Sequence, residues 1–331
     1  MNPLVSVVVT TYNQASYIEE TLESVFAQTY RSYEVIVVDD GSTDDTPSRI
    51  APFRDRIIYV RQDNQGVAGS RNTGIRKARG EFVAFLDGDD LWEPDKLSFQ
   101  VAAAERHPES GLIAVDGLQF GENGIIETSL LFGPFCRDLP VHSITQGNYY
   151  HQLLNSQLIY TTSQVMIPAR VFDVVGLSDE QFKRASDYDL YIRIAAKLDF
   201  TIIRKRLTKW RYLSSSASGP LDLRFINYFL ENLRILKKQL KVCKVTDRAL
   251  IRNIIREKTA DGVEKLYKYG IESDRAHATK IFLKLFTQMP MHTFSLCCLV
   301  GLWCPSFLRR KIAPAVRRIL CRVDGQPTLN S

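Results

Sequence analysis

Four short apolar runs, each followed by polar residues and a helical pattern, constrain the fold of this chain most. The runs lie at residues 5–9, 35–38, 57–61 and 82–86. Short, continuously apolar runs are typical of strands that are buried on both faces. Strands that alternate with helices form a mostly parallel sheet with helices on both of its faces. The first part of the chain is therefore predicted to be an α/β domain.

Polar clusters follow three of these runs, at Thr10–Asn13, Asp39–Asp44 and Asp87–Asp90. In an open α/β sheet, ligands bind beyond the carboxyl ends of the strands. We therefore expect the three clusters to converge at one edge of the sheet. The alternative for the second cluster is that its aspartates only cap the helix that follows it.

The third cluster has the sequence Asp87-Gly88-Asp89-Asp90. Gly88 lets the chain turn tightly, so that the carboxylates of Asp87 and Asp89 can approach one small volume. Hard oxygen ligands without nearby His or Cys suit Mg²⁺ or Mn²⁺, which keep open positions for phosphate oxygens. The motif indicates a metal–diphosphate site, and the alternative is an acidic turn in which Asp90 caps the next helix.

Two further residues have a functional and a structural interpretation. A helical pattern over residues 185–195 puts Asp187 at the helix N-terminus, where free N–H groups favour an ionised carboxylate. Asp187 is thus either a functional carboxylate or a capping residue. Trp92 either forms the floor of a ligand pocket or closes the core.

The chain is expected to divide into residues 1–220 and a basic helical region of residues 221–331. Residues 1–220 carry 22 Lys and Arg against 28 Asp and Glu, whereas residues 221–331 carry 21 against 9. Six cysteines without a C-x-x-C pair are interpreted as reduced thiols. With an N-terminus that has no pattern of a secretory signal, this predicts a cytoplasmic protein.

The basic region contains an apolar stretch, residues 292–308, that is shorter than the roughly 20 residues of a membrane-spanning helix. We expect it to lie in the interface of an anionic membrane, peripherally on the inner face. The alternative is a helical bundle with a solvated basic face. Nucleic acid is not an expected partner, because aromatic residues are not interleaved with the basic clusters.

Beyond the fourth strand, the pattern is less regular. We expect a strand at residues 112–116, loops over residues 117–146, and two short strands near residues 200–203 and 207–212.

Five segments in order resemble the inverting family 2 glycosyltransferases, which use nucleotide-sugar donors on a GT-A fold. These segments are VSVVVTTYN (5–13), VIVVDDGSTDDT (35–46), NQGVAGSRNTG (64–74), FVAFLDGDD (82–90) and SDYDLYIRIA (186–195). The resemblance implies a Rossmann-like GT-A sheet flanked by helices, with the C-terminal helical region appended to it.

The resemblance also implies roles for individual residues. Asp187 would be the base that deprotonates the acceptor hydroxyl, Asp89 a metal ligand, and Asp87 a ligand that approaches both the metal and the ribose. The residues that would hold the donor nucleotide are Thr10, Tyr12, Asn13, Asp39, Asp40, Arg71 and Gly88. Of the two neighbouring aspartates, Asp39 and Asp40, one would contact the nucleotide base. The chain departs from the family at Ser186, where Glu is common, and at residues 210–213, which lack a common His, so a third metal ligand is not identified.

The implied reaction moves a sugar from a nucleoside diphosphate to an acceptor hydroxyl, with Mn²⁺ or Mg²⁺ as cofactor. The donor is expected to be a UDP-sugar, with dTDP- and GDP-sugars as alternatives. The acceptor is expected to be a glycan or a lipid-linked glycan of cell-surface polysaccharide or glycolipid synthesis. The alternatives are a non-catalytic nucleotide-sugar-binding protein and a nucleotidyltransferase, although the latter would need a basic, glycine-rich phosphate loop where Thr10–Asn13 stand. A dehydrogenase is excluded because G-x-G-x-x-G is absent after the first strand.

Overall fold

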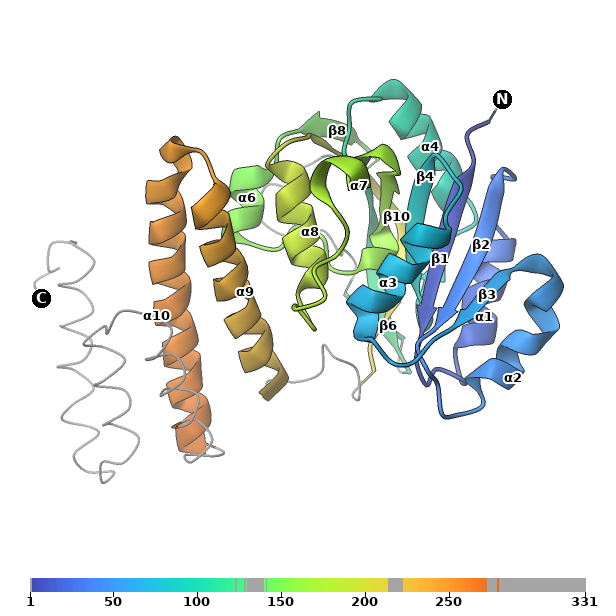
Figure 1. Cartoon of the computed structure of the whole chain (residues 1–331), viewed down its shortest axis with the longest axis horizontal. Helices are drawn as coiled ribbons and strands as arrows, with labels where there is room; N and C mark the ends of the chain where they lie inside the picture. Colours follow the sequence, from blue (N-terminus) through green and yellow to red (C-terminus); the bar gives the residue numbers. More distant parts are fainter. Residues whose placement is uncertain are drawn as a thin grey trace, which may run out of the picture. The chain divides into compact units, whose positions relative to one another are not determined.

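A computed structural model of the chain describes residues 2–122, 124–127, 129, 140, 142–213, 223–272 and 279 (Figure 1). The chain forms two compact units, Met1–Ile235 and Leu236–Ser331. The first unit contains the sheet and all the candidate site residues.

Ten strands within the described residues form one sheet, in the order β3-β2-β1-β4-β9-β6-β10-β5, with β7 beside β6 and β8 beside β10. Strands β1 to β4 are parallel, as are β6 and β10, whereas β9 is antiparallel to both β4 and β6. The expected GT-A sheet is confirmed, and its half beyond β4 is mixed. The strands are β1 (Val5–Thr11), β2 (Tyr33–Asp39), β3 (Ile58–Arg61), β4 (Phe82–Asp87), β5 (Leu91–Trp92), β6 (Leu112–Gly121), β7 (Gly124–Glu127), β8 (Ile144–Gly147), β9 (Val165–Pro168) and β10 (Phe200–Arg211).

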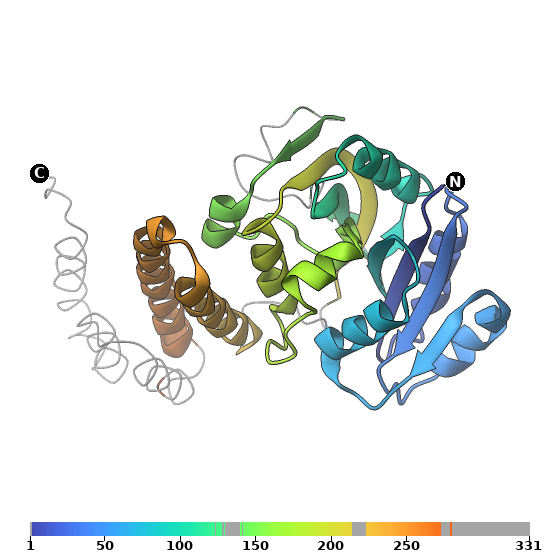
Figure 2. The same cartoon turned by 45° about the horizontal axis from the view of Figure 1, so that its top comes forward.

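Helices cover the sheet, as the alternating pattern predicts (Figure 2). The helices of the first part are α1 (Ile18–Phe26), α2 (Thr46–Ile50), α3 (Gly66–Lys77) and α4 (Lys96–Arg106). Those that follow are α6 (Tyr150–Asn155), α7 (Arg170–Val175) and α8 (Ser186–Ala195), and two short 3-10 helices are η1 (Ala51–Arg56) and η2 (Thr162–Gln164).

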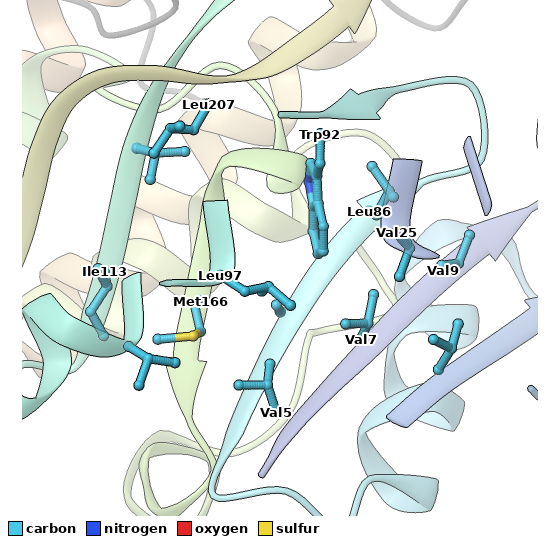
Figure 3. Packing of buried hydrophobic residues seen from close by; sticks show 14 of the residues in the cluster. Val5, Val7, Val9, Val25, Leu86, Trp92, Leu97, Ile113, Met166 and Leu207 are labelled. Carbon is cyan, nitrogen blue, oxygen red and sulfur yellow. The ribbon is translucent and has the colours of Figure 1, made fainter. Parts of the chain in front are cut away.

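The two faces of β1 pack against different helices, because successive side chains of a strand point to opposite faces. Val5, Val7 and Val9 lie in the core that also contains Leu22 of α1 and Leu97 of α4 (Figure 3). On the other face, α3 approaches Val8 so closely that a Cβ on Gly74 would lie 2.2 Å from Val8 Cγ1.

Trp92 belongs to this core and not to an acceptor pocket. Its side chain lies among Leu86, Val25 and Leu97 (Figure 3), it is only 4% exposed, and its Nε1 donates to the carbonyl of Ser163 at 2.9 Å. The core interpretation of Trp92 is therefore confirmed.

The structure differs from the expected elements after residue 116. Part of the segment expected as loops is strand: β6 continues to Gly121, and β7 and β8 follow. The two short strands expected at residues 200–212 are one strand, β10, with irregular pairing to β6 between Ile203 and Thr208. The basic residues 204–206 interrupt the apolar pattern at this irregularity, whereas pairing with β6 continues on both sides of it.

Within the described residues, the C-terminal part is helical, as expected, with α9 (Leu223–Val242), η3 (Val245–Asp247) and α10 (Arg248–Glu272). The first unit extends into α9 as far as Ile235. Across the described stretches of the chain, no helix combines the length and the apolarity needed to cross a membrane. The apolar stretch of residues 292–308 lies outside the described residues.

Candidate active site

The register of the parallel strands brings the predicted clusters together. Strand β1 lies between β2 and β4, and Thr10 pairs with Asp87 while Thr11 pairs with Asp39. The polar residues at the ends of the three strands therefore meet at one edge of the sheet, as parallel strands require.

Asp87 forms the centre of a network of charged and polar side chains. Its Oδ1 accepts a hydrogen bond from Arg71 Nη2 at 2.9 Å and a longer one from Thr10 Oγ1 at 3.3 Å. Its Oδ2 accepts from Thr162 Oγ1 at 3.3 Å, and Thr162 also contacts Arg71. The carboxylate remains 28% exposed. Asp87 is thus fixed by three elements and still open to a ligand.

Arg71 is a buried cation placed between carboxylates. Burial lowers the pKa of its guanidinium, but the charges of Asp87 and Asp187 overcome this effect and raise the pKa above its ordinary value. Its Nε is buried without a hydrogen-bond partner among the described residues. Arg71 therefore interacts with both Asp87 and Asp187, to which the family resemblance gives different roles.

Asp89 lies near Asp87 and experiences its charge. Burial and the Asp87 carboxylate raise the pKa of Asp89 to about 6, against the opposing effects of Arg211 and of a hydrogen bond from Gln14. Gly88, between the two aspartates, donates its N–H to the carbonyl of Thr10 at 2.9 Å. A Cβ on Gly88 would lie 2.5 Å from Gln14 Oε1 and 3.0 Å from Thr11 Cβ, so the close approach needs glycine.

Asp90 is a buried carboxylate that binds residues of other elements and does not cap a helix. It is fully buried, and its Oδ2 accepts hydrogen bonds from Ser163 Oγ at 2.5 Å and Thr161 Oγ1 at 3.1 Å. Its Oδ1 accepts from the N–H of Arg211 at 3.0 Å. The following helix, α4, begins only at Lys96. Asp90 therefore joins η2 and β10 to the acidic loop, residues 87–90.

Asp187 lies in the first turn of α8, as predicted. Its Oδ1 accepts the N–H of Tyr188 at 2.8 Å. Burial raises the pKa of the Asp187 carboxyl, against the lowering effects of Arg71 and the Tyr188 N–H. A raised pKa makes a carboxylate a stronger base than an exposed aspartate.

The two aspartates after β2 are occupied by hydrogen bonds from the chain itself. Asp39 accepts from Ser42 N at 2.8 Å and Tyr59 Oη at 2.7 Å. Asp40 accepts from Gln65 N at 3.0 Å and Gly66 N at 2.8 Å, at the start of α3. Asp40 thus orients the helix that carries Arg71, and a contact of either carboxylate with a nucleotide base stays a prediction.

Among the other predicted donor contacts, Tyr12 and Asn13 differ in their surroundings. Tyr12 is 47% exposed and open to a ligand. Asn13 has a positive φ of 53°, and its Oδ1 accepts the N–H of Thr43 at 2.8 Å. Asp44 accepts the N–H of Thr46 at 3.0 Å and its hydroxyl at 2.6 Å, whereas Asp45, the N-cap residue of α2, makes no side-chain cap hydrogen bond.

The segment where the family commonly has a His, residues 210–213, contains Arg211. Arg211 Nε donates to the carbonyl of Asp89 at 2.9 Å, and its Nη2 donates to Glu20 at 2.6 Å. The guanidinium lies over the rings of Tyr17 and Phe120. Among the described residues, no group of three or more His, Cys, Asp or Glu could hold a metal ion.

A divalent ion nevertheless fits the residues that are present. Asp87 and Asp89 are two hard oxygen donors with crowded negative charge, and Mg²⁺ is usually held by one or two carboxylates together with water and substrate phosphates. The donor set is therefore complete only together with a phosphorylated ligand.

Sequence reasoning missed two residues of the site. Thr162 comes from η2, and its sequence surroundings carry no motif. Tyr191 lies one helical turn after Asp187, and its buried hydroxyl has no hydrogen-bond partner in the described part of the chain. Burial and the Asp187 charge raise the pKa of Tyr191. Its four-residue spacing from Asp187 on α8 was a signal that could have found it.

Comparisons with known proteins agree with this geometry. An uncharacterized glycosyltransferase of Rickettsia typhi is 32% identical over 192 residues, which cover 58% of each chain. The glucosyltransferase WfaP of Escherichia coli, named as acting from UDP-Glc on α-D-GlcNAc-diphosphoundecaprenol, is 43% identical over 100 residues, or 30% of this chain and 40% of WfaP. The chain thus spans only part of the length of these curated relatives.

A solved structure shares the fold. Residues 1–349 of TarS from S. aureus, in complex with UDP-GlcNAc, align with a TM-score of 0.64 at 20% identity, over 97% of this chain and 92% of that one. The model of glycosyl transferase family 2 matches residues 6–173, which include β1, the acidic loop and η2. A match over half of the chain, on the residues that build the carboxylate cluster, shows that the chain belongs to glycosyl transferase family 2.

Proposed function

We propose that the chain is a metal-dependent glycosyltransferase that moves a sugar from a nucleoside diphosphate to an acceptor hydroxyl with inversion. One observation carries this proposal: Asp187 and Asp87, the neighbour of Asp89, interact with the same buried cation, Arg71. A base and a site for a leaving diphosphate are thereby held close together in one charged network.

The chain's own residues supply the parts that direct displacement needs. The acceptor hydroxyl attacks the anomeric carbon while the bond from that carbon to the diphosphate oxygen breaks. The hydroxyl proton passes to Asp187, and the bonding electron pair leaves with the nucleoside diphosphate. A general base in such a role contributes roughly 10²–10⁴-fold to the rate.

Asp87 and Asp89 would hold the divalent ion, and the ion would neutralise the charge that develops on the diphosphate. Arg71 keeps Asp87 in place and adds positive charge beside it. The exposed ring of Tyr12 and the hydroxyl of Thr10 are available to the nucleotide.

The substrate classes follow from the relatives. The name of WfaP specifies a UDP-sugar donor and a lipid-linked acceptor, and TarS was solved with UDP-GlcNAc. We therefore propose a UDP-sugar donor and a glycan or lipid-linked glycan acceptor, as in the synthesis of cell-surface polysaccharides. A lipid-linked acceptor would also explain a peripheral attachment of the basic region, residues 221–331, to the cytoplasmic face of an anionic membrane.

The test is release of nucleoside diphosphate by the full chain with Mn²⁺. UDP-glucose, UDP-GlcNAc and GDP-mannose are offered with a GlcNAc-diphosphate that carries a synthetic alkyl tail. Asp187→Asn should lower turnover about 10²-fold or more, since the amide cannot take the proton. UDP should bind the variant as it binds the wild type.

The matched control is Asp173→Asn, on the exposed surface of α7, which should keep wild-type turnover. Wild-type rates in Asp187→Asn would remove Asp187 from the mechanism. Binding of UDP-sugars by the wild type without any turnover would favour the alternative, a nucleotide-sugar-binding protein.

A further inference from the structure

A carboxylate from α9 binds the backbone just before the helix that carries Asp187. Glu231 Oε1 accepts the N–H of Lys183 at 3.1 Å, and its Oε2 accepts the N–H groups of Arg184 and Ala185, each at 2.9 Å. Glu231 is 9% exposed. One buried side chain thus satisfies three consecutive backbone donors that lie far from it in the sequence.

The helix that begins just after the bound segment has no side-chain cap of its own. Ala185 stands at the N-cap position of α8 and cannot accept a hydrogen bond with its side chain, so the helix start has no side-chain cap. The N-terminus of a helix carries partial positive charge, which favours a nearby carboxylate. Charge-assisted hydrogen bonds of this kind are stronger than neutral ones. Glu231 therefore supplies from α9 the anchoring that Ala185 lacks.

The anchored segment ends two residues before Asp187. The backbone at residues 183–185 sets where α8 begins, and so where Asp187 projects from its first turn. Tyr228 of α9 makes another contact, in which its hydroxyl donates to Gln157 Oε1, just after α6, at 2.6 Å. The charge of Asp187 is among the causes that raise the pKa of Tyr228, so α9 lies close to the candidate base itself.

We propose that Glu231 is a positioning residue for catalysis, which fixes Asp187 by holding the backbone N–H groups of residues 183–185. This role rests on the proposed function, in which Asp187 is the base. Glu231 does not exchange a proton with the substrate. Its effect is geometric, and a base displaced by about 1 Å can lose about 10²-fold in rate.

Three variants of the full chain test this role. Glu231→Ala removes all three hydrogen bonds. Glu231→Gln keeps one carbonyl oxygen, which can still accept from Arg184 and Ala185. Arg234→Ala changes an exposed residue on the same helix and serves as the control.

Two readouts are measured well below the melting temperature of each variant. The first is amide hydrogen exchange of the peptide that covers residues 183–188. The second is UDP release with UDP-glucose, Mn²⁺ and the alkyl GlcNAc-diphosphate, as separate kcat and KM values. In Glu231→Ala, exchange should rise and kcat should fall about 10- to 10²-fold, while the KM for UDP-glucose stays within about twofold. Glu231→Gln should restore most of both readouts, and Arg234→Ala should match the wild type.

The outcomes separate this inference from the proposed function. Unchanged exchange in Glu231→Ala would overturn the inference whether or not the protein turns over UDP-glucose. Raised exchange with an unchanged kcat would show that the anchoring has no catalytic role. A wild type that turns over no donor would refute the proposed function and, with it, the catalytic role of Glu231, while the exchange result would still report on the anchoring itself.

Discussion

Neighbouring carboxylates in the acidic loop make different interactions because their surroundings differ. Asp87 is paired with Arg71, Asp89 is crowded by Asp87, and Asp90 is buried among hydroxyl and N–H donors. The sequence predicted that Asp87 and Asp89 converge, from the glycine between them. It could not separate Asp90 from a helix cap, because the donors to Asp90 come from residues 161, 163 and 211. The role of each carboxylate is decided by distant partners.

The crowding at Asp89 makes a pH-dependent prediction. The pKa of Asp89 is raised from 3.8 to about 6 in the fold, so the folded state favours the protonated form. The protonated Asp89 therefore adds at most about 3 kcal/mol to the free energy of unfolding. This contribution is fully present below about pH 4 and is lost as the pH rises through about 6. Mn²⁺ should offset this loss, so the increase in melting temperature caused by Mn²⁺ should be larger at pH 7.5 than at pH 5.

This behaviour is measured by thermal unfolding with and without Mn²⁺ across that pH range. The variant Asp89→Asn should remove most of the pH dependence and most of the effect of Mn²⁺. An equal response to Mn²⁺ in this variant and in the wild type would mean that the ion binds elsewhere.

At the scale of elements, the first four strands, their helices and the start of β6 were predictable, whereas the full length of β6, the strands β7 and β8 and the continuity of β10 were not. Strands β1 to β4 could be predicted because each is a short, continuously apolar run, which is a pattern within a few neighbouring residues. Strand β8 and the continuity of β10 depend on pairing between strands that lie far apart in the sequence, which no local pattern reports. The same distinction explains the site: Asp87 and Asp187 stand in motifs, whereas Thr162 and Glu231 act through contacts across the fold.

Helix α3 carries Arg71, and its packing on β1 can be tested through Gly74. An added Cβ would lie 2.2 Å from Cγ1 and 3.0 Å from Cγ2 of Val8, a stiff side chain within the sheet. Overpacking of this kind costs about 1–3 kcal/mol, which exceeds the gain of up to about 1 kcal/mol from replacing a helical glycine by alanine. Gly74→Ala should therefore lower the free energy of unfolding in urea.

The matched control is Gly147→Ala in β8, where the nearest atom to an added Cβ lies 4.0 Å away. This variant should unfold at nearly the wild-type urea concentration. If Gly74→Ala is as stable as the control, α3 can shift away from β1 without cost, and the account of its packing is wrong.

At the scale of the whole molecule, charge is divided unevenly along the chain. Residues 1–220 carry a net charge of −6 and residues 221–331 a net charge of +12. A basic region of this kind is attracted to anionic lipid headgroups, within about a Debye length of the surface. The division of the chain at residue 220 stays a prediction, and the compact first unit extends to Ile235.

The proposed membrane attachment predicts flotation of the full chain with vesicles of phosphatidylglycerol and phosphatidylcholine. Flotation should be strong at low salt and weak at high salt, because screening shortens the reach of the basic residues. Replacing Arg309, Arg310 and Lys311 by Gln should weaken flotation, and vesicles of phosphatidylcholine alone provide the control. A chain that fails to float with anionic vesicles at low salt would contradict the attachment.

The contacts of Glu231 also bear on synthesis of the chain. A nascent polypeptide that ends at residue 220 already contains every strand of the described sheet and each residue assigned to the donor, yet the amides of Lys183, Arg184 and Ala185 have no carboxylate to bind. These three hydrogen bonds form only after the ribosome has extruded α9. The order of translation thus delays this anchoring of the segment before α8 until every strand of the described sheet has been made.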